Sequence, residues 1–207
     1  MNFQEIIKLL DEYHIKMADC QIVRKKSEAV AASEKLDYPV AIKVISSEII
    51  HKTDKGCLKL DLKSKDDVEA AFDEITKNAV NAKIDGYILQ KMAKSGLELL
   101  VGGKKDPVFG QVIVFGIGGI FVEVFNDVSM RICPIQKSDA EEMLNEIRGH
   151  ALLYGVRGKK PIDVKALTTL LVNVSKMLDE HQEITELDLN PVIAYPDGYL
   201  AVDARVL

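Results

Sequence analysis

Residues 186–207 read as two strands joined by a turn, and their polar side chains fall on alternate positions. Because successive side chains of a strand point to opposite faces, Asp188 and Asn190 share one face of the first strand. Asp203 and Arg205 share a face of the second. Carboxylate and amide oxygens are the ligands that a hard divalent cation such as Mg²⁺ prefers, and such a cation also binds nucleotide phosphates. The pattern therefore indicates a candidate magnesium site on Asp188, Asn190 and Asp203.

The pairing of these strands depends on the turn between them. If Asp197-Gly198 forms a two-residue turn, Asn190 lies opposite Arg205, and the polar groups of both strands point the same way. Pro191 can disturb that register. A solvated sheet face with ordinary charge pairs shows the same alternation, and spacing alone slightly favours this simpler interpretation.

Three further features could bind phosphate. Lys43 interrupts the apolar run VAIKVI, where it either contacts a phosphate or extends its ammonium group into water from an edge strand. The glycines of FGIGG at 115–119 allow close approach of a ligand to the backbone, although a bend or bulge explains them as well. Three arginines could each bind phosphate with a fork of donors, or simply be surface residues: Arg131, Arg148 and Arg157.

One nucleophile stands out in the polar segment 46–56, between two predicted strands. His51 is a good nucleophile at neutral pH, because an imidazole has an unperturbed pKa of about 6.5. Asp54 is close enough in sequence to orient the ring. An exposed loop histidine without a chemical role fits the same residues.

The elements that must position these residues are helices and paired strands. Helical periodicity predicts helices at 3–14, 27–36, 64–79, 138–148 and 163–178. Strands are expected at 38–46, 57–62, 86–92, 98–103 and 111–116, followed by the final hairpin. Since the strands occur in pairs with short turns, we expect an α+β fold with largely antiparallel sheets. Lys94-Ser95-Gly96 reads as a connector between lobes at 1–93 and 94–207.

The composition excludes several classes of protein. The chain has 207 residues, 47% of them apolar, and a net charge of -5, so no basic excess is present to bind nucleic acid. No apolar run approaches the roughly 18 residues of a membrane span, and the N-terminus lacks the features of a signal peptide. Three widely spaced cysteines without a CxxC pair fit reduced thiols. We therefore expect a cytoplasmic protein that binds neither nucleic acid nor membranes, and neither a P-loop nor a Rossmann motif is present.

Several segments, taken in order, resemble the β subunit of ADP-forming (NDP-forming) acetyl-CoA synthetases, ATP-grasp proteins related to the succinyl-CoA synthetase β subunit. They are YPVAIKVIS with HKTDKG, GYILQKM with GLELLVGGKKDPVFG, VIVFGIGGIFVEV, YGVRGKKPID, and ELDLNPVIAY with LAVDARV. The resemblance covers almost the whole chain. It implies an ATP-grasp fold whose two α/β lobes hold ATP or ADP between them.

The resemblance also implies a role for individual residues, beginning with the nucleotide contacts. Lys43 resembles the first-lobe lysine that meets the phosphates, and Glu98 resembles the acidic residue on the ribose side. The segment Gln90, Lys91 and Met92 looks like the hinge along which adenine lies. The Gly-Gly bend beside the phosphates matches Gly118 and Gly119.

The catalytic and metal-binding groups follow in the same way. Asn190 and Asp203 are similar to the pair that binds the catalytic Mg²⁺, with Asp188 as an additional carboxylate. His51 matches a loop histidine proposed to carry a phosphoryl group transiently, with Asp54 as its neighbour. The expected reaction converts acyl-CoA, ADP and phosphate into a carboxylate, CoA and ATP.

A second subunit is required by this interpretation. The family's CoA-binding α subunit, which carries its own phosphorylated histidine, is absent from the chain, so a hetero-oligomer such as α2β2 is expected. Two alternatives remain open: a succinyl-CoA synthetase-type or other ATP-grasp ligase, and a non-catalytic nucleotide-sensing domain of an acyltransferase. His51 disfavours the other ligases, and a sensor would bind nucleotide without phosphorylation of His51.

Overall fold

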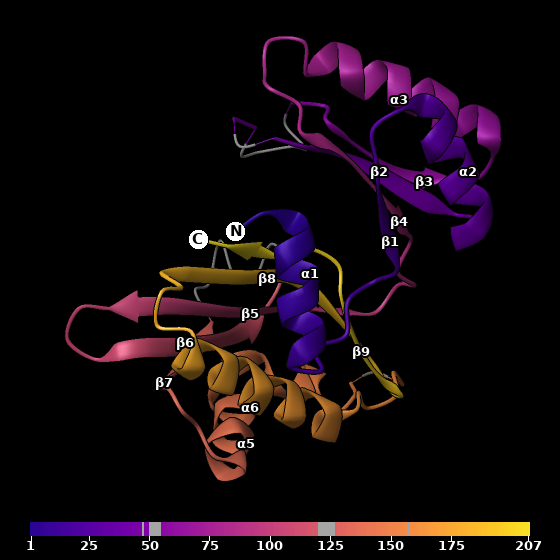
Figure 1. Ribbon diagram of the computed structural model, residues 1–207. Coiled ribbons are helices and arrows are strands. Elements are labelled where there is room, and N and C mark those ends of the chain that lie inside the picture. Colours follow the sequence, from indigo (N-terminus) through magenta and orange to yellow (C-terminus); the bar gives the residue numbers. More distant parts are fainter. Residues whose placement is uncertain (47, 50–54, 120–126, 157) are drawn as a thin grey trace. The chain divides into compact units, whose positions relative to one another are not determined.

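The computed structural model describes residues 1–46, 48–49, 55–119, 127–156 and 158–207 (Figure 1). Within these residues the chain forms two compact units. The small unit is Ala18–Lys94, and the large unit combines Met1–Met17 with Ser95–Leu207. Each unit has its own cluster of buried apolar side chains. None of the described helices is both long and apolar enough to cross a membrane.

The small unit is an antiparallel sheet with two helices packed on one face. Its elements are β1 (Cys20–Val23), α2 (Lys26–Leu36), β2 (Val40–Ile45), β3 (Leu58–Leu62), α3 (Lys65–Asn78) and β4 (Gly86–Lys91). The strand order is β1-β4-β2-β3. The helix α3 begins where the Ser64 side chain accepts a hydrogen bond from the Asp67 N–H, as expected for an N-cap serine. Alternate residues of the central strands pack on the helices, and the remaining side chains lie on the other face of the sheet and point away from the helices.

The large unit has a longer antiparallel sheet. Its elements are α1 (Phe3–Glu12), β5 (Leu97–Asp106), β6 (Gly110–Ile117), β7 (Val128–Ile132), α5 (Lys137–Glu146), the 3₁₀ helix η1 (Arg148–Leu152), α6 (Val164–Glu180), β8 (Glu186–Tyr195), β9 (Gly198–Ala201) and β10 (Arg205–Val206). The strand order is β10-β8-β5-β6-β7, with β9 also paired to β8. The α+β fold with antiparallel sheets, predicted from the sequence, is confirmed.

One face of the large sheet packs against α5 and α6. A Cβ added to Gly103 would clash with Leu178 of α6, so the glycine lets this helix lie directly on β5. Buried residues on that face of β6, Ile113 and Phe115, join the same core. We call the opposite side of the sheet the far face.

The first helix differs from the division expected at residues 93 and 94. The segment Met1–Met17 groups with the large unit, because Leu9 and Leu10 are buried in its core. The Lys16 carbonyl also accepts a hydrogen bond from the Ala201 N–H at 2.9 Å. The periodicity of α1 predicted the helix, but the core against which it packs depends on residues far along the chain.

The two-residue turn considered at Asp197-Gly198 does not form. Tyr195 pairs with Gly198, so the two turn residues are Pro196 and Asp197. The pairing is therefore displaced by two residues, and Arg205 lies opposite Asp188 rather than Asn190. The register of β8 against β5 also shifts, between Leu99 and Val101.

Candidate functional site

The polar residues of the final hairpin lie on the far face of the large sheet. In β8 and β10, Leu187 is opposite Val206 and Asp188 is opposite Arg205. Leu187 and Val206 are buried in the core, so Asp188 and Arg205 point from the other side. On the neighbouring strand, Gly102 is opposite Asp188. Since Gly102 has no side chain, β5 places none beside the Asp188 carboxylate at this position.

Asn190 and Asp203 meet in the same register. Continuing the pairing of β8 and β10 by two residues toward the turn brings Asn190 opposite Asp203. One step further, the Val202 N–H donates to the Pro191 carbonyl at 2.9 Å, which keeps the two segments paired. Directly opposite residues of antiparallel strands have Cβ atoms about 5 Å apart. The amide oxygen of Asn190 and the carboxylate of Asp203 can therefore reach one cation.

The hairpin carboxylates act on one another electrostatically. Partial burial raises the pKa of the Asp188 carboxyl, and the negative charges of Asp203 and Glu186 raise this pKa further. The nearby Arg205 guanidinium lowers it. The Asp203 carboxylate is oriented by the Ala204 N–H, which donates to Oδ1 at 3.1 Å. A divalent cation in this place would relieve the repulsion between the carboxylates.

This donor set fits Mg²⁺. Within the described part of the chain, no group of three His, Cys, Asp or Glu side chains converges as a metal site. Mg²⁺ does not require one, because it commonly takes one or two protein carboxylates and completes its octahedron with water and substrate phosphates. One amide oxygen and one carboxylate, Asn190 and Asp203, with Asp188 beside them, match that requirement.

Glu98 lies against the Gly-Gly bend that follows β6. Its carbonyl accepts a hydrogen bond from the Gly118 N–H at 2.8 Å. Gly119 has φ +68, and a Cβ there would come within 3.1 Å of Glu98 Oε2. Glycine is therefore favoured at 119 both by its backbone conformation and by the nearby carboxylate. The structure brings together these three residues, which the sequence assigned to the nucleotide.

Two other predicted residues meet in the small unit. The register of β2 and β4 makes Lys43 and Gln90 diagonal neighbours on one face of the sheet. The residues beside them, Ile42 and Leu89, belong to the apolar core, so Lys43 and Gln90 point away from α2 and α3. Their exposed fractions are only 6% and 4%. Burying an ammonium group among apolar strands costs free energy unless polar groups lie nearby. The amide side chain of Gln90, its diagonal neighbour, can provide one.

The two residues after Gln90 are held by one side-chain contact and one backbone hydrogen bond. The Lys91 ammonium lies 3.6 Å from the Asp37 carboxylate. The Met92 N–H donates to the Pro39 carbonyl at 3.0 Å. Both contacts connect the end of β4 to the segment that precedes β2.

Cys20 belongs to the same face as Lys43 and Gln90, although the sequence predicted only a reduced thiol without a role. It pairs with Gln90 across β1 and β4. Burial raises the pKa of its thiol, and the positive charge of Lys43 partly offsets this. The alternation of CQIV was the available signal, but it acquires meaning only once β1 is known to pair with β4.

Arg131 lies on the helix-covered face, not on the far face. Its cross-strand partner is Ile113, which is buried in the core. The guanidinium donates to Glu146 at 2.9 and 2.7 Å and to Glu142 at 3.4 Å. The hydrogen bond from Arg131, followed by one from Ser129, lowers the pKa of Glu146 to about 2. The structure therefore does not bring Arg131 together with the hairpin carboxylates.

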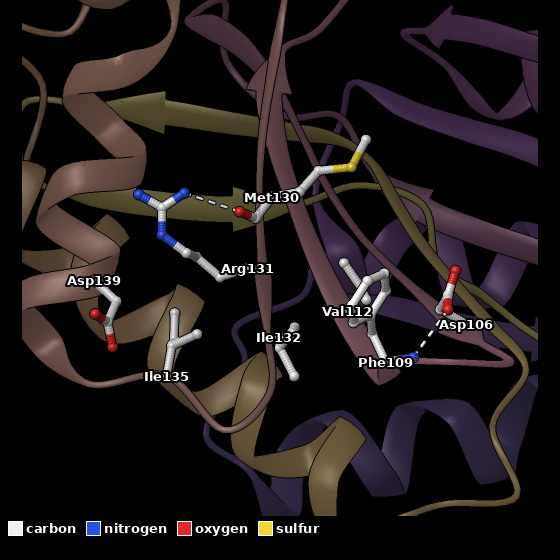
Figure 2. Close-up of a pocket in the computed structure, with 8 residues that line it drawn as sticks. All are labelled: Asp106, Phe109, Val112, Met130, Arg131, Ile132, Ile135 and Asp139. Atoms are coloured by element: carbon white, nitrogen blue, oxygen red, sulfur yellow. Dashed lines mark hydrogen bonds between the residues drawn. The ribbon is translucent and has the colours of Figure 1, made fainter.

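A largely apolar hollow of about 670 Å³ lies beside the edge strand β7 (Figure 2). Its lining residues are Asp106, Phe109, Val112, Met130, Arg131, Ile132, Ile135 and Asp139. In Figure 2 the Arg131 guanidinium turns back to the Met130 carbonyl, to which it donates at 2.9 Å. Arg131 is the one lining residue that the sequence had assigned to the nucleotide. We do not assign catalysis to this hollow.

The predicted nucleophile His51 and its neighbour Asp54 lie outside the described residues, as does Arg157. Their predicted roles rest on the sequence.

Known proteins share this sequence and architecture. The ATP-grasp domain family matches residues 1–207. The β subunit of acetate–CoA ligase (ADP-forming) I from Pyrococcus furiosus is 43% identical, over 99% of this chain and 88% of its own length. Acetate–CoA ligase (ADP-forming) I from Archaeoglobus fulgidus is 44% identical, over 98% of this chain. Our chain spans only 30% of the length of that second relative.

A solved structure agrees with both. Acetyl-CoA synthetase 1 of Ca. Korarchaeum cryptofilum, in complex with CoA, Ca-AMPCP and HgCl⁺, superposes with a TM-score of 0.95 and 39% identity, over 99% of this chain and 91% of that one. Another structure of the same enzyme holds CoA and Mg-AMPPCP, with a phosphohistidine segment that points toward the nucleotide-binding site. From the matching family, the identity to a separate β subunit and the shared fold, the chain belongs to the ATP-grasp β subunits of ADP-forming acetate–CoA ligases.

Proposed function

We propose that this chain is the nucleotide-binding subunit of an ADP-forming acyl-CoA synthetase, with acetyl-CoA as the expected acyl donor. The observation that carries the proposal is the common register of the last strands, in which Asp188 lies opposite Arg205 and Val192 opposite Ala201. Between these pairs Asn190 falls opposite Asp203 on the far face. This donor set fits Mg²⁺ bound to nucleotide phosphates. The reaction is acyl-CoA + ADP + phosphate ⇌ carboxylate + CoA + ATP.

The chain's own part of the reaction is the last phosphoryl transfer. The phosphoryl group arrives on a histidine of the partner and passes to His51, with Asp54 orienting the ring. The N–P bond of His51 then breaks as a terminal phosphate oxygen of ADP forms the new P–O bond. Such a transfer depends mainly on positioning and on neutralising charge.

The binding residues divide the nucleotide among them. Lys43 contacts the phosphates, and Gln90, Lys91 and Met92 flank the adenine. Glu98 holds the ribose beside the Gly118-Gly119 backbone. Asn190 and Asp203 would hold Mg²⁺, which would supply charge neutralisation on the phosphate oxygens. Arg131 is left out of this set, because Glu146 and Glu142 already bind its guanidinium on the other face of the sheet.

A CoA-binding α subunit completes the enzyme in this proposal. The chain spans 88% of the separate Pyrococcus β subunit but 30% of the longer Archaeoglobus protein. We expect the remaining part of that longer protein to correspond to the α subunit, which carries its own phosphorylated histidine. An α2β2 assembly is the proposed stoichiometry.

The proposal is tested by measuring nucleotide binding and turnover separately. Isothermal titration of the chain with ADP should show binding that requires Mg²⁺ and is lost in EDTA. After reconstitution with the α subunit, acetyl-CoA and phosphate should drive ATP formation. Binding without any turnover of the reconstituted complex would favour a nucleotide sensor, and no Mg²⁺-dependent binding would exclude the proposed site.

A further inference from the structure

Arg205 occupies a position in the hairpin that the family resemblance leaves without a role. It lies in β10 directly opposite Asp188. Its neighbour Val206 is buried, with an exposed fraction of 3%, so the Arg205 side chain points from the far face. Along the strand, Asp203 is two residues away on the same face, at a spacing of roughly 7 Å. A long guanidinium side chain therefore stands next to the proposed metal pair.

The far face around Arg205 carries more negative than positive charge. Asp188 and Asp203 each contribute a carboxylate, and Asn190 contributes a neutral amide. Glu186 adds a third carboxylate at the start of β8. Its carbonyl accepts a hydrogen bond from the Leu207 N–H at 2.9 Å. Lys104 of β5 lies opposite Glu186 on the same face, and Arg205 is the positive group whose backbone position lies opposite Asp188. Its charge is permanent, because arginine stays protonated in proteins.

A positive charge at this distance has opposite effects on two ligands. A bare divalent cation at Asn190 and Asp203 is repelled by the guanidinium. The complex of Mg²⁺ with ADP carries a net negative charge, so the same guanidinium attracts it. An arginine fork also forms strong charge-assisted hydrogen bonds with phosphate oxygens.

We propose that Arg205 makes the hairpin selective for Mg²⁺ already bound to nucleotide phosphates, over the bare cation. This inference rests on the proposed function, since it assigns a partner to the same metal pair. Arg205 acts on that pair from the adjacent position of the strand: it lowers affinity for free metal and contacts the phosphates that accompany it. The site would thereby remain ready for nucleotide at high concentrations of free Mg²⁺.

The experiment compares two affinities in Arg205→Gln and wild type. Free Mn²⁺ binding without nucleotide is measured by electron paramagnetic resonance, and Mg²⁺·ADP binding by isothermal titration. We expect Mn²⁺ to bind about sevenfold more tightly to the variant, the Coulomb effect of a unit charge on a divalent ion roughly 7 Å away in water. Mg²⁺·ADP should bind about tenfold more weakly, through loss of one charge-assisted contact.

Two further variants give the comparison its controls. Arg205→Lys keeps the charge but loses the fork, so Mn²⁺ affinity should stay near wild type while Mg²⁺·ADP affinity falls partway. Lys176→Gln removes one positive charge from α6, where the lysine faces Glu180 at 3.8 Å. That helix covers the opposite face of the sheet, so both affinities should remain unchanged. Thermal unfolding checks that every variant is folded.

The outcomes separate this inference from the proposed function. If wild type binds Mg²⁺·ADP but Arg205→Gln changes neither affinity, or weakens both, the selectivity role is overturned and the proposed function stands. A loss of folding in Arg205→Gln together with wild-type behaviour in folded Arg205→Lys for both ligands also overturns it. Absence of Mg²⁺-dependent ADP binding in wild type removes the proposed function and this inference with it.

Discussion

In the proposed metal site, Asn190 and Asp203 would offer one cation two different ligands, a neutral amide oxygen and a charged carboxylate. The carboxylate provides most of the attraction for Mg²⁺, whereas the amide mainly provides geometry. Both stand on the far face of the hairpin, while the residues that hold the strands in place, Leu187 and Val206, point into the core. Substitutions of the polar residues should therefore change metal binding more than folding.

Asp203→Asn should weaken Mg²⁺-dependent binding of ADP by at least about tenfold, because a charged metal ligand becomes a neutral one of the same shape. Isothermal titration with and without Mg²⁺ measures the change. Asp197→Asn, in the turn of the same hairpin, is the matched control and should bind as wild type does. An unchanged Mg²⁺-dependent affinity in Asp203→Asn would remove this residue from the site.

His51→Ala should bind Mg²⁺·ADP normally and make no ATP from acetyl-CoA and phosphate when reconstituted with the α subunit. The change removes the nucleophile that we propose, and it leaves the phosphate and metal ligands in place. Turnover is followed by ATP formation, and mass spectrometry at neutral pH should detect an acid-labile phosphate on the wild-type chain. Near-normal ATP synthesis by the variant would exclude the relay.

The strands and helices were largely predictable, because their signals are local. Alternation in ELDLNPVIAY and periodicity in the segment that became α6 each depend on neighbouring residues. The hairpin register was not, since both Pro196-Asp197 and Asp197-Gly198 are good turn pairs and the sequence does not choose between them. The face of Arg131 was equally hidden, because it follows from the pairing of β7 with β6.

The ion pair between the edge strand β7 and α5 should stabilise the large unit in a pH-dependent way. The pKa of Glu146 is lowered to about 2, chiefly by Arg131, below the value of about 4.3 expected in the unfolded chain. The contribution is therefore complete above about pH 5 and declines as the pH falls toward 2. Glu146→Gln should lower the urea midpoint at pH 7, and this difference from wild type should shrink between pH 5 and pH 3.

A substitution of Arg131, the partner of Glu146, tests whether this ion pair stabilises the fold or belongs to the nucleotide site. Arg131→Gln should lower the urea midpoint in the same way, yet leave the affinity for Mg²⁺·ADP unchanged, because Arg131 lies on the helix-covered face. Glu142→Gln is the milder comparison, since its carboxylate lies 3.4 Å from the guanidinium. A clear loss of Mg²⁺·ADP affinity in Arg131→Gln would return this arginine to the nucleotide site.

At the scale of the whole molecule, the proposed nucleotide contacts are shared between two units with separate cores. Lys43 and Gln90 belong to the small unit, and Glu98 and Asp203 belong to the large one. The sequence indicated the connector at 94–96, but it could not show that α1 belongs with the large unit, because that depends on packing between residues distant in the chain.

Saturating Mg²⁺·ATP should protect the connector at 94–96 and the segment 46–56 from trypsin, because residues of both units are proposed to bind the nucleotide. Cleavage after Lys55 and Lys94, followed by mass spectrometry, measures the protection. ATP in excess EDTA is the control, and it should leave the cleavage rates near those of the free protein. Equal rates with and without Mg²⁺·ATP would argue against nucleotide binding by residues of both units.

The turn at Pro196-Asp197 contributes no residue to the proposed metal site, yet its length decides which side chains meet on the far face. Side chains of a strand alternate between faces, so one inserted residue would tend to exchange the polar and apolar sets of the following segment. Asp203 would then point into the apolar core and Ala204 toward the far face. Two inserted residues would restore the faces but give each group a new neighbour. The most length-sensitive part of this surface is thus a segment with no chemistry of its own, and engineered tags or grafted loops belong elsewhere on the protein.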